Sequence, residues 1–345
     1  MPPSKFENAI STLREKHEIE RTGEPEIVTT GSLMLDFALR KGGIPRGCIV
    51  DLFGEESLGK TTLTISIMSE RVKNKEHCAY IDVEHRINHD LVNLLIPDEF
   101  KEYWHEFQPK DGDSALALLE SFVKMNEFRM IAVDSMAAIV PCEMLEEDAN
   151  PNRPGLAASR ITQALKRIMG PVYGNEQIVI LINQMRDNMS FFAKPGGKKS
   201  TTINALKFFS SIRMQISNEG LVREGDESSG QKVMLSIVKN SFAKPHGKAP
   251  MTIMFGHGID KTRDLVDCGI MTGVVMKNGG WLSYKGANDQ GEPMEVKAHG
   301  EDELMEKLAP AMNKIGQDIH LAMKLLTQLK GEDKNDEAGD TEPKE

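Results

Sequence analysis

The sequence is poor in the features of exported, disulfide-linked and membrane-embedded proteins. It holds only four cysteines in 345 residues, and none has a partner at zinc-binding or redox-motif spacing. The longest plain aliphatic run, Ile178 to Ile182, is far shorter than the roughly 20 residues that cross a bilayer. The first residues lack the basic-then-apolar pattern of an export signal. We therefore expect reduced thiols, no membrane association and a cytoplasmic location.

A positive net charge is also missing, because the chain carries −10 at neutral pH. Residues 331–345 alone contribute −5, from seven acids and two lysines. Residues 186–199, by contrast, carry +3, from one arginine and three lysines against one aspartate. Since phosphate groups bind to local patches, the overall charge does not exclude a nucleic-acid partner.

Short apolar runs alternate with helical patterns between residues 28 and 260, which predicts an α/β core with a mostly parallel sheet covered on both faces. The expected strands are Cys48–Phe53, Cys78–Asp82, Met130–Asp134, Ile178–Ile182 and Val233–Val238. The expected helices are Lys60–Lys73, Leu156–Met169 and Ala205–Phe209.

Smaller units flank this core. Residues 1–27 are expected to form an N-terminal helix and a polar linker. Residues 261–330 are expected to form a small α+β C-terminal domain, since apolar residues recur at helical spacing after Glu301. Residues 331–345 read as an acidic disordered tail.

A glycine-rich segment between the first strand and helix of the core fits the phosphate-binding pattern G-x-x-x-x-G-K-[ST]. Its glycines let backbone N–H groups face phosphates, its lysine reaches the β- and γ-phosphates, and its threonine hydroxyl binds Mg²⁺. The expected ATP contacts are Gly54, Glu55, Glu56, Ser57, Leu58, Gly59, Lys60, Thr61 and Thr62.

Two acids at strand ends supply the remaining chemistry. Asp134 closes an apolar strand and is expected to hold the Mg²⁺ together with Thr61. Glu84 follows another strand and is the candidate for polarising the attacking water. Without the phosphate loop, Asp134 would read as a turn or cap residue and Glu84 as a solvated strand-end carboxylate.

An ordered series of further motifs makes the chain resemble the RecA family of DNA recombinases, bacterial or phage-encoded, over residues 28–286. The segments that carry the resemblance are Thr30–Asp36, Gly42–Gly47, Gly54–Thr61, Ile81–His85, Val133–Ser135, Gly155–Ala158, Ile182–Gln184, Asn204–Phe208, Val238–Asn240 and Trp281–Gly286.

The resemblance implies an N-terminal helix that packs on a neighbouring protomer, with ATP bound between protomers. It makes Glu84 the catalytic glutamate and Gln184 the sensor of the γ-phosphate. It also implies that Lys239 reaches across to the neighbour's ATP and that Phe208 lies in the protomer interface.

Several positions depart from the family pattern. The adenine-side positions appear as Asn88 and Leu91, while Phe255 offers an aromatic face. The family's second interfacial lysine is replaced by Ser241. Lys244 is the candidate substitute, and the alternative is that it is simply a solvent-exposed lysine. Thr202-Ile203 stand where the family has two glycines, which should stiffen that segment.

Two loops are expected to hold DNA. The first, about residues 146–154, contributes Arg153 and is followed by a helix with Arg160 and Lys166. The second, about residues 185–203, combines cations with an aromatic side chain, which suits contact with a single strand. Its expected contacts are Arg186, Phe191, Lys194, Lys198 and Lys199.

The sequence thus favours a DNA-dependent ATPase that forms a filament on single-stranded DNA and pairs it with a homologous duplex. A RecA-fold DNA motor such as a ring helicase is the alternative enzyme. A nucleotide-gated DNA scaffold with weak hydrolysis is the non-enzymatic alternative, which the intact Lys60, Glu84 and Asp134 disfavour.

We predict that replacing Lys194, Lys198 and Lys199 together by alanine weakens single-strand binding. Fewer counterions are then released, so the slope of log affinity against log salt becomes shallower by up to about 2. Fluorescence anisotropy of a labelled oligonucleotide at several salt concentrations measures this slope, and an unchanged slope removes these lysines from the DNA path.

Overall fold

The computed structural model describes residues 23–139, 156–184, 206–225 and 227–336. Its centre is one nine-stranded mixed sheet in the order β11-β10-β9-β8-β3-β7-β6-β4-β5, with five parallel and three antiparallel pairings. The strands are β3 (Cys48–Gly54), β4 (Cys78–Asp82), β5 (Trp104–Phe107), β6 (Met130–Asp134), β7 (Ile178–Gln184), β8 (Ile212–Glu224), β9 (Glu227–Asn240), β10 (Lys248–Met254) and β11 (Gly258–Ile259). The α/β fold with a mostly parallel sheet is confirmed, and all five predicted strands are present.

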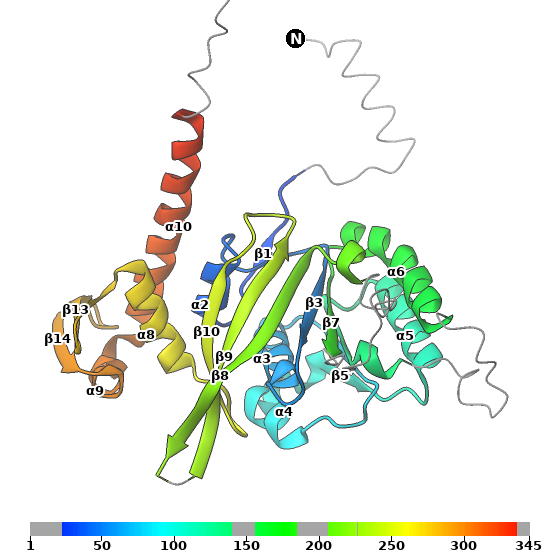
Figure 1. Ribbon diagram of the computed structural model, residues 1–345, viewed down its shortest axis with the longest axis horizontal. Coiled ribbons are helices and arrows are strands. Elements are labelled where there is room, and N and C mark those ends of the chain that lie inside the picture. The colour runs from blue at the N-terminus through cyan, green and yellow to red at the C-terminus, as the bar shows by residue number, and fades with distance from the viewer. Residues whose placement is uncertain (1–22, 140–155, 185–205, 226, 337–345) are drawn as a thin grey trace, which may run out of the picture.

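Helices cover both faces of the sheet (Figure 1). Successive strand residues face opposite sides, so Val50 and Leu52 join one core while Ile49 joins the other. The first core includes residues of α2 (Leu33–Ala38), α3 (Lys60–Lys73) and α4 (His89–Leu95), and the second those of α5 (Gly112–Met125) and α6 (Leu156–Gly174). Being buried on both faces explains why the parallel strands read as unbroken apolar runs.

The residues after 260 form a smaller unit of helices around a three-stranded antiparallel sheet. Its elements are α8 (Lys261–Thr272), β12 (Val275–Asn278), β13 (Trp281–Ala287), β14 (Pro293–His299), α9 (Glu301–Leu308) and α10 (Met312–Asp336). A short pair, β1 (Ile27–Val28) and β2 (Ile44–Pro45), precedes and follows α2. No helix among these described residues is long and apolar enough to cross a membrane.

Helix α10 continues to Asp336, so its last residues overlap the segment that was expected to begin the acidic tail at residue 331. Glutamate and lysine are good helix formers, so a charged composition does not mark the end of a helix. The N-terminal segment 1–22 and residues 337–345 lie outside the described residues. Among the described cysteines, Cys48, Cys78 and Cys268 are buried free thiols, as expected.

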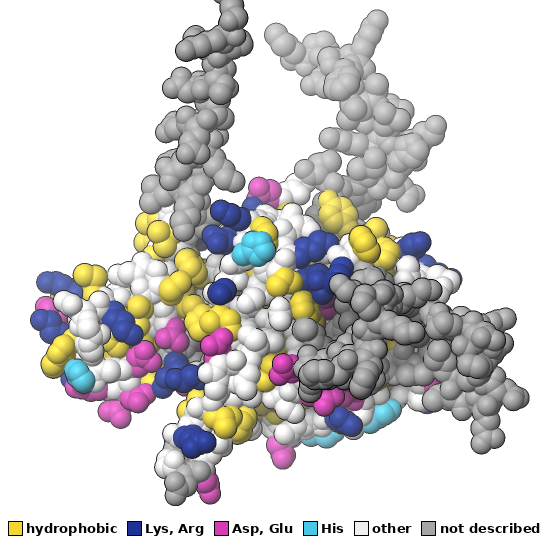
Figure 2. Space-filling model, viewed as in Figure 1, with side chains coloured by type: hydrophobic (Ala, Val, Ile, Leu, Met, Phe, Trp, Pro, Cys, Tyr) yellow, Lys and Arg dark blue, Asp and Glu magenta, His cyan; other side chains and the backbone are white. Residues whose placement is uncertain are grey.

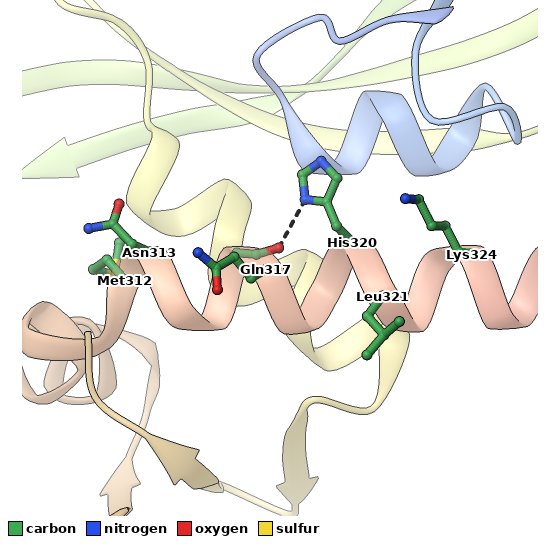
Figure 3. A pocket seen from close by; sticks show the side chains of 7 residues that line it. Met312, Asn313, Gln317, His320, Leu321 and Lys324 are labelled. Carbon is green, nitrogen blue, oxygen red and sulfur yellow. Dashed lines mark hydrogen bonds between the residues drawn. The ribbon is translucent and has the colours of Figure 1, made fainter. Parts of the chain in front are cut away.

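A buried carboxylate fastens α8 to the start of α2. Asp264 accepts hydrogen bonds from Ser32 Oγ and Leu33 N, both at 2.6 Å, and Ser32 is also the N-cap of α2. On the far side of this junction, His320 of α10 is turned toward α2 and donates from Nδ1 to Gly316 O at 2.9 Å (Figure 3). Burial raises the pKa of Asp264 to about 7, although its hydrogen bonds oppose that rise.

We predict that the contribution of Asp264 to the free energy of unfolding decreases as the pH rises from about 4 to about 7. Its pKa increases on folding from 3.8 to about 7, so the folded state binds the extra proton. The resulting stability is complete below pH 3.8 and is lost as the pH rises through the folded value. Thermal melts of wild type and Asp264→Asn should show a Tm difference that changes between about pH 5 and about pH 8, because asparagine does not titrate. The same difference at both pH values would contradict the prediction.

Candidate nucleotide-binding site

Four neighbouring parallel strands end at the same edge of the sheet, with β4 and β6 ending two residues before β3 and β7, and their ends bring the predicted motifs together. In the register, Gly54 of β3 is paired with Gln184 of β7, and Asp82 of β4 with Asp134 of β6. The carboxyl ends of parallel strands are where α/β proteins bind ligands. Segments distant in the sequence therefore meet at this one edge of the sheet.

The phosphate loop leads from β3 directly into α3. Gly59 is the N-cap of α3 and has φ +82°, and an added Cβ there would lie 2.6 Å from Ile253 Cδ1. The free N–H groups at the start of α3 can therefore face an anion at close range. Gln231 of β9, which also lines the hollow, donates from Nε2 to Ser57 O at 3.1 Å.

The side chain of Lys60 folds back onto the backbone of the phosphate loop. Its Nζ donates to Gly54 O at 3.1 Å and to Glu55 O. The residue is 7% exposed, and burial lowers its pKa while nearby carboxylates, Asp134 foremost, oppose that effect. The ammonium group is therefore held where phosphate oxygens would take the place of the carbonyl partners.

Asp134 and Thr61 form a compact pair of oxygen donors. Thr61 Oγ1 donates to Asp134 Oδ2 at 2.5 Å, and Tyr80 Oη donates to the same oxygen at 2.7 Å. Burial raises the pKa of Asp134 and raises that of Tyr80 well above 10, so the phenol keeps its proton and remains a donor. Hydroxyl and carboxylate oxygens are the ligands that Mg²⁺ prefers, usually together with phosphate oxygens and water. This donor set fits magnesium, although the described residues hold no cluster of three or more metal-binding side chains.

Glu84 is held by groups from three other positions. Its Oε1 accepts from Ser135 Oγ at 2.5 Å and from Gln184 Nε2 at 2.8 Å, and its Oε2 lies 3.6 Å from a guanidinium nitrogen of Arg86. The structure thus brings Glu84 and Gln184, which the sequence suggested separately, into direct contact. Asp82, two residues earlier, instead accepts from Ile87 N and Gln108 Nε2.

These groups border a hollow of about 360 Å³. The rim includes Phe255, which is 47% exposed and offers the expected aromatic face. Asn88 and Leu91 do not line the hollow: the Asn88 side chain caps α4, and Leu91 is buried in the core. A second hollow runs along α10 (Figure 3) but has no carboxylate to share a metal with a phosphate.

The residues expected at the protomer interface lie toward the opposite end of the sheet. Lys239 donates to Lys207 O at 3.0 Å and to Phe208 O at 3.5 Å, in the segment that leads into β8. Phe208 is 81% exposed, and Lys244 is exposed in the connection from β9 to β10. We call this region, with Lys207, Lys239, Lys244 and Lys248, the basic end of the sheet; Figure 2 shows Lys and Arg side chains gathered there, near the top of the view.

Most of the predicted DNA contacts cannot be placed. Arg153, Arg186, Phe191, Lys194, Lys198 and Lys199 lie outside the described residues. The two that are described lie on α6, where Arg160 forms an ion pair with Asp113 at 2.6 Å and Lys166 is exposed.

Three side chains at the site carry no motif signal and were missed: Arg86, Tyr80 and Gln231. Arg86 follows Glu84 by two residues at a strand end, which was the one available hint. Tyr80 reads as an ordinary apolar strand residue, and Gln231 lies far away in sequence on β9.

The chain is similar to known proteins over most of its length. The family model of the RecA N-terminal domain matches residues 7–260. Protein RecA of Pseudomonas putida is 39% identical over 271 residues, which cover 77% of this chain and 74% of the relative. Protein RecA of Paramagnetospirillum magneticum is 39% identical over 270 residues, covering 76% and 72%. Protein RecA of Rhizobium rhizogenes is 38% identical over 274 residues, covering 77% and 73%.

We predict that Gly59→Ala weakens nucleotide binding at least about tenfold. The added Cβ would meet Ile253 Cδ1 and is disfavoured at φ +82°, so the loop must move. Gly170→Ala is the matched control, because a Cβ at that helical position meets nothing within 4 Å. Isothermal titration with ATP compares the two, and equal affinities would show that the loop tolerates a side chain at Gly59.

Proposed function

The chain belongs to the RecA family, and from that membership we propose how it works as a DNA-dependent ATPase and RecA-like recombinase. ATP binds in the hollow at the strand ends, the protein assembles on single-stranded DNA, and the filament pairs that strand with a homologous duplex. One observation carries the proposal: Lys60, Asp134, Glu84 and Gln184 come from four separate segments and border the same hollow. That set supplies a phosphate clamp, a metal ligand, a water-orienting carboxylate and a sensing amide.

Hydrolysis follows from the positions of these groups. The oxygen of a water held by Glu84 bonds to the γ-phosphorus, the bond to the β,γ-bridging oxygen breaks, and ADP leaves. Glu84 accepts the proton of the water and passes it to solvent. Lys60 and the N–H groups at the start of α3 stabilise the charge that develops on the phosphate oxygens.

Thr61 and Asp134 would hold magnesium in this site. When bound, the metal neutralises negative charge on the phosphate oxygens. Tyr80 and Thr61 together keep the Asp134 carboxylate oriented toward the hollow, since both donate to its Oδ2.

The link to DNA runs through Gln184. Its amide contacts Glu84 beside the hollow, and the chain continues from it into the segment expected to bind the single strand. A contact of Gln184 with the γ-phosphate would therefore change how that segment begins. Lys239 and, more weakly, Lys244 are proposed to meet the ATP of a neighbouring protomer, with Phe208 in the same interface.

We predict that Glu84→Gln loses ATP hydrolysis by about 10²–10⁴-fold while still binding ATP and single-stranded DNA. Glutamine keeps the shape and can keep a hydrogen bond with Ser135, but it cannot accept the proton of the water. Lys60→Ala is the comparison, because it removes a cation from the phosphates and should lose nucleotide binding as well.

Phosphate release with and without single-stranded DNA, and binding of a fluorescent ATP analogue, measure both effects. Electron microscopy of Glu84→Gln with ATP and single-stranded DNA should show helical filaments. Closed rings would instead support a helicase-like motor. A wild-type protein that binds no ATP, or whose hydrolysis ignores DNA, would overturn the proposed function.

A further inference from the structure

Arg86 is a cation at the nucleotide hollow that the hydrolysis scheme above leaves without a role. It lines the hollow beside Glu84, and its side chain is 79% exposed. Among the described residues, its ion-pair partner is Glu84 Oε2, at 3.6 Å. An exposed ion pair of this length is weak and screened by salt, so the guanidinium can leave Glu84 at little cost.

The charge balance of the hollow indicates that the guanidinium can serve to bind phosphate. Among the described residues that line it, the acids are Glu56, Glu84 and Asp134, and the cations are Lys60 and Arg86. Three acids against two cations leave the lining at −1 before a strongly anionic triphosphate enters. Of the two cations, Arg86 is the one whose head group is not already bonded to the loop backbone, so it can turn to an incoming phosphate.

The backbone that carries Arg86 is fixed, although its head group is held only by the weak contact with Glu84. Asp82 Oδ2 accepts from Ile87 N at 3.2 Å, which closes the turn around Arg86. Directly after it, Asn88 Oδ1 accepts from Asp90 N and Leu91 N and so caps α4. A long side chain on an anchored turn can swing between two partners without moving the chain.

We propose that Arg86 binds the γ-phosphate of ATP within its own protomer, and that this movement frees Glu84 Oε2 to hold the attacking water. The inference rests on the proposed ATPase function. Guanidinium groups bind phosphate oxygens with paired hydrogen bonds, and an arginine that reaches a γ-phosphate stabilises the charge of its transfer. Before ATP arrives, Arg86 lies beside Oε2 while Ser135 and Gln184 donate to Oε1. The guanidinium therefore competes with water for the one oxygen of Glu84 that these hydrogen bonds leave open.

The contact would make the site distinguish ATP from ADP, because ADP has no phosphate for Arg86 to reach. In Arg86→Ala, we expect affinity for a nonhydrolysable ATP analogue to fall about tenfold, as for loss of a charged hydrogen bond, while ADP affinity stays within about twofold. The affinity of Arg86→Lys for the ATP analogue should lie between those of the wild type and Arg86→Ala, since lysine keeps the charge and loses the paired donors. Displacement of fluorescent ADP from the full-length protein, without DNA, measures each affinity.

Two further variants test whether the loss of affinity comes from a direct contact between Arg86 and the phosphate. Arg223→Ala, an exposed arginine on the β8–β9 hairpin that does not line the hollow, should change neither affinity. In a Glu84→Gln background, Arg86→Ala should still lose affinity for the ATP analogue, because the phosphate contact does not pass through Glu84.

Equal losses for the analogue and ADP would mean that Arg86 only shapes the hollow, and that result would overturn the proposal. Unchanged affinities would overturn it too, as would a loss that disappears in the Glu84→Gln background. A wild-type protein that binds neither nucleotide would instead refute the ATPase function on which the inference rests.

Discussion

The in-register pairing of β3, β7, β6 and β4 is the constraint on which the rest of the structure depends. It holds Gly54 beside Gln184 and Asp82 beside Asp134, so that four strand ends form one edge. No side chain at the site has to reach far, because the backbone has already brought its segment there. A slip of one residue in any pairing would turn that strand's side chains to the opposite face and disperse the site. The apolar residues of these strands thus determine how the strands pair, and the pairing determines which side chains meet at the nucleotide site.

A buried ion pair joins β3, which bears the phosphate loop, to its other neighbour, β8. Arg213 of β8 donates to Asp51 of β3 at 2.7 Å, and its guanidinium lies 4.4 Å from the centre of the Phe53 ring. Burial raises the pKa of Asp51, while Arg213 opposes that rise. Arg213 is paired in register with Lys239, whose pKa is lowered by burial and then by the arginine's charge. The strand that bears the phosphate loop and the strand that bears the basic end are therefore electrostatically linked through one residue.

Sequence reasoning found the parts of the site that follow directly from local patterns. The phosphate loop, Asp134 and Glu84 each come just after an apolar strand, so their convergence could be predicted from strand ends alone. Arg86 could not be identified in this way, because an exposed arginine in a turn looks like any solvated charge until the fold shows what it faces. On the adenine side, family position suggested Asn88 and Leu91. The residue types themselves indicate structural roles, since asparagine before a helix is a common N-cap and a leucine in the helix favours the core.

The placement of the two charged regions also bears on assembly. The nucleotide hollow lies at the carboxyl ends of the parallel strands, whereas Lys239 points toward the end where β3 and β8 begin. A contact between the basic end and a bound nucleotide therefore requires a second copy of the chain, arranged head to tail. Such an interface uses two different surfaces, so it repeats indefinitely as a helix unless the rotation between copies closes a ring. A filament and a ring thus differ in the rotation between neighbouring copies and not in the chemistry of the nucleotide site. The same site residues therefore fit both a recombinase and a ring helicase, and the shape of the assembly distinguishes the two.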